Sequence, residues 1–324
     1  MVAGVSAGEG IGHPRVRRWV RRHPAISFDQ SADNPAVLEL CDRLGLAPVV
    51  RDLGGEDNLT LLVDSGRRVL RTYKSFITRR RLAEIQRLRC TLAAAGLHVP
   101  VPERIGGISL FRCGPRWAEV EPFRTLPSPG KSDAAALFRG LGRLHRALAA
   151  VPALATHDLR RSFVTGSTLV RWVSANVADG LIDTERAGEI RRRIRQLERF
   201  WVDPYELPMQ VIHSDPHAAN ILAIEPDEFV FIDFIGAELA PRIHDVAIAY
   251  MYVLYAARDR LGTVAEKLPA LLDEYAAGAH RRLVRREYEA LPVYTAAAAL
   301  YYEICDWAPG MDAISAWLLD SIDT

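Results

Sequence analysis

A group of five side chains suited to holding a metal or moving a proton stands out in one short stretch, "VIHSDPHAANILAIEPDEFVFIDF". They are His213, Asp215, His217, Asn220 and Asp233. Asp215 and Asp233 follow or end apolar runs, and a carboxylate is costly to bury unless something binds it. Such a concentration is typical of a functional site, and the local fold must decide which chemistry it serves.

A β-hairpin is predicted to bring two of these side chains together. The apolar runs "ILAIE" and "FVFID" are separated by the turn-forming pair Pro226-Asp227. As antiparallel neighbours about 4.8 Å apart, they place Asn220, before the first strand, near Asp233, at the end of the second. Asp215 lies on the loop that enters the hairpin. Two carboxylates and an amide oxygen around one point suit Mg²⁺, which adds phosphate oxygens and water to such ligands.

The chain before this stretch is β-rich first and helical later. A short helix is expected around Ala36–Leu46, followed by strands in "VVRDLGG", "NLTLLVD", "RRVLRTY", "ISLFRC" and "RWAEVEPF". Between the third and fourth of these strands, "TRRRLAEIQRLRCTLAAAG" has the helical period, with one stripe formed by Leu82, Ile85, Leu88 and Leu92. This part is predicted to be a small antiparallel sheet with one inserted helix.

Helical patterns dominate beyond the expected linker "TLPSPGKSD". They are "DAAALFRGLGRLHRALAA", "DTERAGEIRRRIRQLERFW", "HDVAIAYMYVLYAARDR" and "VAEKLPALLDEYAAGAHRRLV". Strands first and helices later predict an α+β fold in two lobes. The expected division is an N-terminal leader over 1–35, a β-rich N-lobe over 36–122 and a helical C-lobe over 123–324.

Composition excludes several classes of function. The 324 residues are 49% hydrophobic, enough for ordinary packed cores, and the net charge of +1 gives no field that favours nucleic acid or a membrane. No apolar run approaches the ~20 residues of a membrane span, and the first residues lack the apolar centre of a signal peptide. The four cysteines are scattered, which argues against zinc and disulfides. A cytoplasmic protein is expected.

The pattern H-x-D-x-x-x-x-N in "HSDPHAAN", followed by an apolar hairpin and the Asp of "FIDF", resembles the aminoglycoside phosphotransferase and choline kinase family. The resemblance implies a bilobal, protein-kinase-like fold and transfer of the γ-phosphoryl group of ATP or GTP to a small-molecule hydroxyl. It implies that Asp215 is the catalytic base and that Asn220 and Asp233 hold Mg²⁺. His213 and Asp245 would support the loop.

The resemblance covers roughly Val49 to Tyr250 and also assigns the nucleotide side of the site. It implies a nucleotide loop in "GGEDNLTLLV", a carboxylate on the inserted helix, and a hinge whose backbone groups meet the adenine. The residues concerned are Gly54, Gly55 and Asn58 for the loop, Glu84 for the helix, and Glu121–Phe123 for the hinge.

The third strand departs from the family pattern, because Arg71 stands where the family usually has Lys. Lys74 follows three residues later, and side chains alternate along a strand, so Arg71 and Lys74 should point to opposite faces. Val69 and Arg71 share a face, as the small residue and the Lys do in the family. Arg71, ion-paired with Glu84, is therefore predicted to contact the phosphates. Arg grips phosphate through two nitrogens but keeps its proton, which leaves ATP and GTP as alternatives.

Two other classes of function stay open. His213, Asp215 and His217 form H-x-D-x-H, which with the pair His244-Asp245 could ligate a transition metal in a metallohydrolase. That interpretation leaves Asn220 and Asp233 without a role. The second alternative is a kinase-like module that binds nucleotide without catalysis.

The acceptor substrate is the least determined feature. After Arg286 the chain has no Lys or Arg but seven acidic residues, and Glu303, Asp306 and Asp312 are candidates for binding a cationic aminoglycoside-type antibiotic or amino-sugar. An acidic outer face explains the same residues equally well. Aromatic residues near the C-terminus could wall a pocket or pack in the core, namely Tyr301, Tyr302, Trp307 and Trp317. Choline, homoserine and sugars remain alternative acceptors, and the oligomeric state is open.

Overall fold

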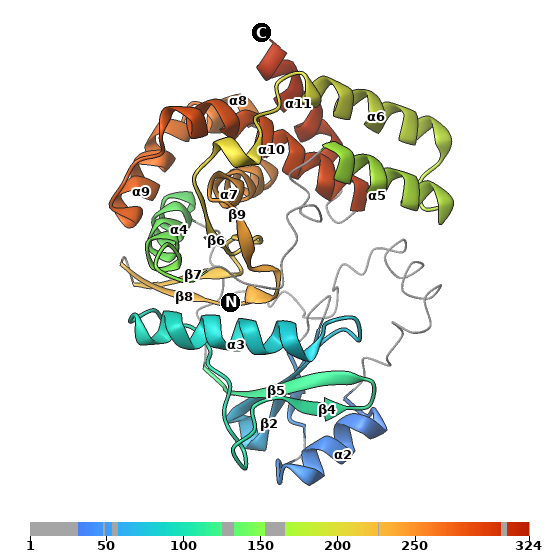
Figure 1. Ribbon diagram of the computed structural model, residues 1–324, viewed down its shortest axis with the longest axis vertical. Helices are drawn as coiled ribbons and strands as arrows, with labels where there is room; N and C mark the ends of the chain where they lie inside the picture. The colour runs from blue at the N-terminus through green and yellow to red at the C-terminus, as the bar shows by residue number, and fades with distance from the viewer. Residues whose placement is uncertain are drawn as a thin grey trace, which may run out of the picture. The chain divides into compact units, whose positions relative to one another are not determined.

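The structure is a computed structural model that describes residues 32–47, 49–53, 58–124, 133–152, 166–225, 227–305 and 310–323. The chain divides into two compact units, Met1–Arg87 with Pro100–Thr125, and Leu88–Val99 with Leu126–Thr324 (Figure 1). The segment Leu88–Val99 thus belongs with the second unit, although the sequence placed it in the N-lobe.

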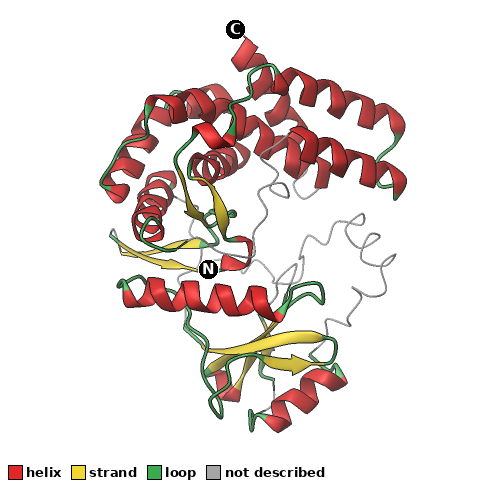
Figure 2. Ribbon diagram, in the orientation of Figure 1, coloured by secondary structure: helices red, strands yellow, loops and turns green. Residues whose placement is uncertain are grey.

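The first unit contains a five-stranded antiparallel sheet in the order β1-β2-β3-β5-β4. Figure 2 shows strands in yellow and helices in red. The strands are β1 (Arg51–Asp52), β2 (Leu59–Val63), β3 (Arg68–Thr72), β4 (Phe111–Cys113) and β5 (Arg116–Pro122). The turn between β2 and β3 is made by Asp64-Ser65-Gly66, all with positive φ. Such backbone favours small or polar turn residues and Gly, so the predicted hairpin turn is confirmed.

Helix α2 (Pro35–Arg43) closes the core on one face of this sheet. Asn34 caps it by accepting a hydrogen bond from the Ala36 amide, and Pro35 occupies the first turn, where no amide hydrogen is needed. Apolar residues of the helix and sheet are buried together, among them Val37, Leu40, Leu61, Leu70 and Val120. Burial of this apolar surface is the main term that holds α2 on the sheet.

Helix α3 (Arg79–Ala94) is the predicted inserted helix. The stripe of Leu82, Ile85, Leu88 and Leu92 is buried, as the helical period predicted. Gly96, with φ +86°, ends the helix in a conformation that a residue with a Cβ disfavours.

The second unit is mainly helical. The four helical patterns predicted for this unit are confirmed. Three of them form α4 (Ala134–Leu148), α6 (Thr184–Glu198) and α7 (Ile243–Ala256). The fourth is divided into two helices, α8 (Leu261–Ala265) and α9 (Leu268–Ala279). Three helices were not predicted, and they are α5 (Gly166–Ala178), α10 (Arg285–Cys305) and α11 (Met311–Asp323). Pro292 lies inside α10, and a proline normally argues against a continuous helix.

Two glycines allow α4 and α9 to cross with their backbones almost in contact. A Cβ built on Gly142 would lie 2.2 Å from the carbonyl oxygen of Tyr275, and one on Gly278 would lie 2.1 Å from that of Arg139. These neighbours are backbone atoms, so no side chain can move aside. The crossing therefore requires glycine at both positions.

Replacing Gly142 by Ala is expected to lower the free energy of unfolding by about 1–3 kcal/mol, because the two helices must move apart. Gly188→Ala is the matched control. Its new Cβ would meet only the end of the Arg192 side chain, at 3.9 Å. Alanine loses less conformational entropy on folding than glycine does, so this variant should be more stable than the native protein by roughly 0.5–1 kcal/mol. Urea unfolding of both variants measures the difference, and equal stability would contradict the close crossing.

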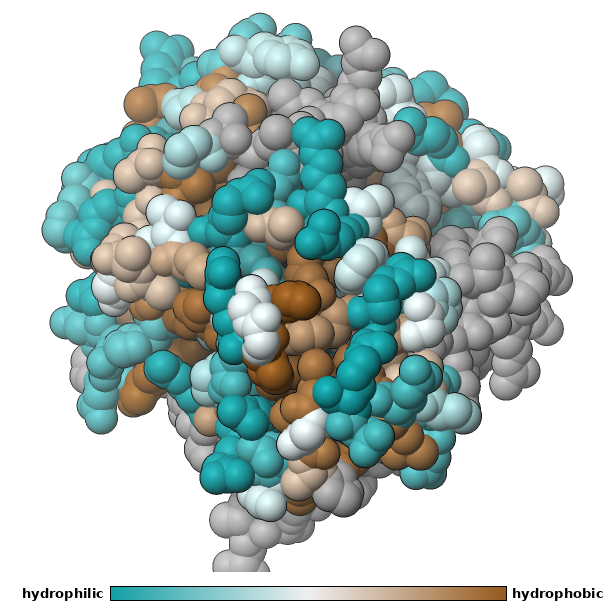
Figure 3. Space-filling model, turned by 60° about the horizontal axis from the view of Figure 1, so that its bottom comes forward, coloured by the Kyte–Doolittle hydropathy of each residue, from teal (hydrophilic) through white to brown (hydrophobic). Residues whose placement is uncertain are grey.

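The described surface mixes polar and apolar groups. Figure 3 shows one face, on which hydrophobic residues are surrounded by hydrophilic ones. Large exposed apolar side chains include Leu38, Val50, Phe76 and Ile108. Within the described part of the chain, no helix combines the length and the apolar character that a membrane span requires.

Candidate active site

The predicted hairpin is confirmed, and its open end carries the expected polar residues. Strand β7 (Ile221–Glu225) pairs antiparallel with β8 (Glu228–Phe231), and Ile221 stands opposite Phe231. One step further, the Ile232 amide donates to the Asn220 carbonyl over 3.0 Å. The ladder thus extends to the two positions where Asn220 and Asp233 leave the hairpin.

A second small sheet supports the loop that contains Asp215. Strand β6 (Met209–Ile212) leads into the loop and pairs with β9 (Glu238–Pro241), which sequence patterns had not indicated. Ser214 has φ +70°, an unusual conformation for a residue with a Cβ, and its hydroxyl donates to Glu238 over 3.0 Å. The loop is therefore held in a strained turn, as is common at functional sites.

Asp245, in the first turn of α7, holds this loop in place through hydrogen bonds. Its carboxylate oxygens accept hydrogen bonds from the amides of His213 (2.7 Å) and Ser214 (2.8 Å) and lie 3.0 Å from His145 Nε2. His145 Nδ1 in turn lies 2.9 Å from the hydroxyl of Tyr275. Burial raises the pKa of Asp245, but the hydrogen bonds and charges of His145 and His213 outweigh it and lower the pKa below its ordinary value.

Asp245→Asn is expected to cost about 3–5 kcal/mol of stability, because an amide nitrogen would face a buried amide donor. A lowered folded pKa means that the Asp245 contribution is complete above the unfolded value of about 3.9 and is lost as the pH falls toward the folded pKa. The variant should therefore lose less further stability on acidification than the native protein does. Urea unfolding at neutral pH and at about pH 3, below the unfolded value, measures both effects, and an unchanged acid dependence would contradict this assignment.

His213 links the loop to the end of the hairpin. Its Nε2 lies 2.8 Å from the Ile232 carbonyl, so it donates there, and its Nδ1 accepts from the Asp215 amide over 3.3 Å. The ring is fully buried. Both ring nitrogens are used in fixing the positions that carry Asp215 and Asp233, which is the supporting arrangement that the resemblance implied.

Asp215 is held through both carboxylate oxygens. Oδ2 accepts from Asn220 Nδ2 at 3.1 Å and lies 3.4 Å from His217 Nε2, while Oδ1 lies 3.1 Å from the Tyr302 hydroxyl and 3.4 Å from that of Tyr252. The side chain is 38% exposed, so a small molecule can reach it. Burial raises its pKa, but interactions with His217, His213 and Tyr302 outweigh this and keep the pKa below its ordinary value. An ionised carboxylate at neutral pH can orient a hydroxyl and receive its proton.

Tyr252, from α7, and Tyr302, from α10, are site residues that the motif did not include. Their hydroxyls lie 3.0 Å apart. The Tyr252 ring packs on the His217 ring, with 4.8 Å between their centroids. The Tyr302 ring packs on the Tyr301 ring, with 5.7 Å between their centroids. Tyr301 and Tyr302 had been named only as alternatives between pocket wall and core. Their position beside Asp215 had no local signal in the sequence.

Two oxygen-bearing side chains of the kind that Mg²⁺ binds, Asn220 and Asp233, stand at the open end of the hairpin. Asn220 turns its Nδ2 toward Asp215, and its Oδ1 is therefore directed elsewhere. Asp233 is half-buried with φ +60°, and its carboxylate has no hydrogen-bond or ion-pair partner among the described residues. One amide oxygen and one such carboxylate fit a Mg²⁺ ion that also binds phosphate.

The same geometry disfavours the metallohydrolase. No group of three or more His, Cys, Asp or Glu side chains within the described ranges could hold a metal. Both ring nitrogens of His213 are engaged with backbone groups. His244 is fully buried, with Nδ1 3.9 Å from Glu238. His213, Asp215 and His217 thus do not form a ligand set.

Arg71 lies inside β3, opposite Glu119, whereas Lys74 follows the end of that strand. Arg71 Nη2 lies 3.3 Å from Glu121 Oε1, an ion pair that the sequence had not indicated. Glu84 is buried, and its predicted pair with Arg71 stays a prediction. The strand position supports Arg71 rather than Lys74 as the third-strand cation.

The predicted hinge residues are partly engaged within their own sheet. The Phe123 amide donates to the Arg67 carbonyl over 2.8 Å, and the Glu121 side chain is buried beside Arg71. The Phe123 N–H is thus not available to adenine while this ladder persists, which corrects one part of the expectation. Asn58 is buried, and Gly54 and Gly55 lie outside the described residues.

The acidic residues proposed for a cationic acceptor are arranged differently from the expectation. Glu303 forms ion pairs with Arg186 (2.7 Å) and Arg193 (2.9 Å), so two guanidinium groups neutralise its charge. Asp312 lies 3.6 Å from Arg186. Asp306 and Trp307 lie outside the described residues. Glu303 is therefore corrected from a substrate contact to a member of a structural ion-pair cluster.

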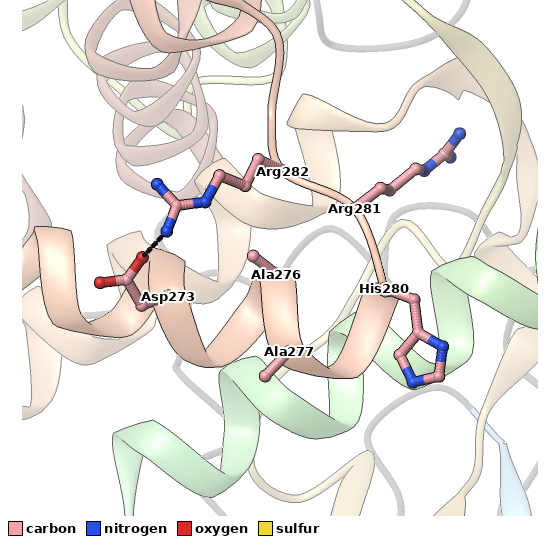
Figure 4. A pocket seen from close by; sticks show the side chains of 6 residues that line it. All are labelled: Asp273, Ala276, Ala277, His280, Arg281 and Arg282. Carbon is pink, nitrogen blue, oxygen red and sulfur yellow. Dashed lines mark ion pairs between the residues drawn. The ribbon is translucent and has the colours of Figure 1, made fainter.

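A surface hollow of about 390 Å³ at the end of α9 is separate from these residues. Figure 4 shows its lining by Asp273, Ala276, Ala277, His280, Arg281 and Arg282. Arg282 pairs with Asp273 at 3.3 Å, and Arg281 donates to Gln210. None of the candidate catalytic residues lines it, so it is not the candidate active site.

Comparison with known proteins gives a consistent result. A homoserine kinase of Methylobacterium nodulans is 28% identical over 262 residues, which is 77% of each chain. An amicoumacin kinase in complex with AMP-PNP and Ca²⁺ has a TM-score of 0.65 at 14% identity, covering 88% of this chain and 92% of that one. A spectinomycin phosphotransferase with ADP and spectinomycin has a TM-score of 0.57 at 13% identity, covering 88% and 93%.

The likeness to the two solved structures confirms the α+β, protein-kinase-like fold predicted from the sequence. A model of the phosphotransferase enzyme family matches residues 48–294, which include the hairpin and the loop that carries Asp215. With three quarters of its length in that match, the chain belongs to the phosphotransferase enzyme family, as a small-molecule kinase.

Proposed function

We propose that this protein transfers the γ-phosphoryl group of ATP or GTP, with Mg²⁺, to a hydroxyl of a small hydroxylated amine. The observation that carries the proposal is the joint arrangement of Asp215, Asn220 and Asp233. One carboxylate is held through both oxygens and is accessible, while an amide oxygen and a second carboxylate are left for a metal. Phosphoryl transfer depends mainly on positioning and charge neutralisation, which this arrangement supplies.

In this mechanism Asp215 accepts a hydrogen bond from the acceptor hydroxyl and receives its proton as the oxygen attacks the γ-phosphorus. The new O–P bond forms as the bond from that phosphorus to the bridging oxygen breaks, and the nucleoside diphosphate leaves. Asn220 and Asp233 would hold Mg²⁺, which when bound neutralises phosphate charge. Asp245 and His213 keep the loop amides in place throughout.

The acceptor is proposed to be an amino alcohol, with homoserine as the first compound to test. The homoserine kinase of 28% identity supports this choice. The aromatic rings beside Asp215 also support it, since Tyr302, Tyr301 and Trp172 follow one another at centroid distances of 5.7 and 6.3 Å. Aromatic faces attract ammonium groups, and they replace the Glu303 carboxylate in that role.

A panel assay of nucleoside diphosphate release tests the function. Homoserine, choline, ethanolamine, an aminoglycoside and a neutral sugar are each supplied with Mg-ATP and Mg-GTP. Release that requires both Mg²⁺ and an amino alcohol supports the proposal, and phosphorylated product identified by mass confirms transfer. Tight nucleotide binding with no product from any acceptor would favour the inactive nucleotide-binding module instead.

On the nucleotide side, Arg71 is proposed to contact the phosphates. Arg71→Ala should weaken nucleotide affinity by about 10-fold or more, since a charge-assisted hydrogen bond is worth roughly 1.5–3 kcal/mol. Lys74→Ala, which removes a cation beyond the end of the strand, is the control and should change affinity little. Calorimetric titration with Mg-ATP compares the two. The reverse result would mean that Lys74 is the phosphate contact.

A further inference from the structure

The two tyrosines on Asp215 form a defined hydrogen-bonded chain. The Tyr302 hydroxyl lies 3.1 Å from Asp215 Oδ1, and the Tyr252 hydroxyl lies 3.0 Å from that of Tyr302. Each phenol has one hydrogen to donate. The two shorter distances therefore describe a relay in which Tyr252 donates to Tyr302 and Tyr302 donates to Asp215. The remaining contact, from Tyr252 to Oδ1, is the longest of the three at 3.4 Å and therefore the weakest.

The two oxygens of Asp215 consequently have different surroundings. Oδ2 accepts from Nδ2 of Asn220, a proposed metal ligand, and lies near His217 Nε2. Oδ1 accepts from Tyr302 through one of its lone-pair directions. Among the described residues, the other contact of Oδ1 is the long one from Tyr252, which an incoming hydroxyl can replace. Oδ1 is thus the oxygen to which an acceptor can donate without breaking the Tyr302 bond.

We propose that Tyr302, supported by Tyr252, is a positioning residue that holds the Asp215 carboxylate so that Oδ1 faces the acceptor hydroxyl. This inference rests on the proposed phosphotransferase function. It assigns to α7 and α10 a part in orienting the base, in addition to the loop and hairpin of the family pattern. Tyr302 is almost fully buried, at 7% exposed, so its ring is fixed by its neighbours and can act as a rigid support.

A double-mutant cycle of Tyr302→Phe and Asp215→Asn tests whether Tyr302 acts through Asp215. The readout is Mg-dependent ADP release from ATP with water as the acceptor, with nucleotide affinity measured separately. Tyr302→Phe alone should lower kcat by about 10- to 100-fold, the value of one hydrogen bond to a charged group, while nucleotide affinity changes less than about twofold. Added to Asp215→Asn, it should have no further effect on kcat.

Two single variants complete the comparison. Tyr252→Phe leaves the Tyr302 bond in place, so its effect on kcat should be several-fold smaller than that of Tyr302→Phe. Tyr294→Phe removes another buried hydroxyl from α10, one that donates to the Val202 carbonyl over 3.2 Å. It should lower the unfolding midpoint and leave kcat unchanged, which separates positioning from a general loss of stability.

The outcomes are distinguishable. A kcat within about twofold of the native value in Tyr302→Phe, or an equal loss of rate in the Asp215→Asn background, overturns this inference and leaves the proposed function standing. If the native protein releases no ADP with water or with any acceptor in the panel, the proposed function fails. In that case the double-mutant cycle of Tyr302→Phe and Asp215→Asn is measured through the unfolding midpoints. If the shifts of the two single variants add up in the double variant, the Tyr302–Asp215 contact itself is absent.

Discussion

Asp215→Asn is expected to keep Mg-nucleotide binding and to lose about 10²–10⁴ in turnover, the usual effect of removing a positioned base. The substituted amide can keep the local geometry. Its oxygen can accept from Asn220, and its nitrogen can donate to the Tyr302 oxygen, so both hydrogen bonds of the carboxylate have a counterpart. What the variant loses is the negative charge and the capacity to receive a proton. Calorimetric nucleotide titration and steady-state rates with the best acceptor of the panel measure the two properties separately.

Ser214→Ala is a useful comparison for that experiment. It removes a hydroxyl from the neighbouring position, where the side chain contacts Glu238 and not Asp215. Its effect on turnover should be at least tenfold smaller than that of Asp215→Asn. Native turnover in Asp215→Asn would show that this carboxylate is structural. It would also leave the kinase without an identified base.

The parts of the site that lie close together in the sequence could be predicted from it. The hairpin follows from two apolar runs around a turn, and the pairing of Ile221 with Phe231 brings Asn220 and Asp233 to one end. Asp245 was identified through the family resemblance. The structure gives two physical reasons for a carboxylate at this position. It accepts hydrogen bonds from the amides of His213 and Ser214. An anion in the first turn of α7 also interacts favourably with the helix dipole.

The contacts that sequence reasoning missed are distant along the chain. Tyr252 and Tyr302 reach Asp215 over separations of 37 and 87 residues, and no local pattern encodes such a meeting. The same holds for Glu303, which looked like part of an acidic surface until Arg186 and Arg193 of α6 were found against it. Net charge along a segment does not show which charges are paired in space.

Buried charge in the C-terminal half gives a second example. Glu287 was counted among the acidic residues after Arg286, but it is fully buried and forms a two-pronged ion pair with Arg242. Burying one of these charges without the other would be strongly unfavourable, so the pair ties the start of α10 to the segment before α7. The acidic character of the segment is therefore partly internal to the fold.

Asp233→Asn is expected to impair both Mg-dependent nucleotide binding and turnover, in contrast to Asp215→Asn. The left-handed conformation at Asp233, with φ +60°, suits Asn as well as Asp, so the backbone should keep its shape. The side chain has no described partner to lose. Only the charge facing the proposed metal site changes, and loss of a direct ligand should cost at least the 10- to 100-fold typical of outer ligand contacts.

The decisive measurement compares nucleotide affinity with and without Mg²⁺. In the native protein Mg²⁺ should tighten binding, and in Asp233→Asn this difference should largely vanish, while affinity without Mg²⁺ stays the same or improves because a negative charge has been removed. Asp227→Asn is the matched control, the same substitution at the turn of the same hairpin, where the side chain is 68% exposed. If both variants keep the full response to Mg²⁺, Asp233 is not a metal ligand, and the open end of the hairpin must serve a purpose other than holding the nucleotide's cation.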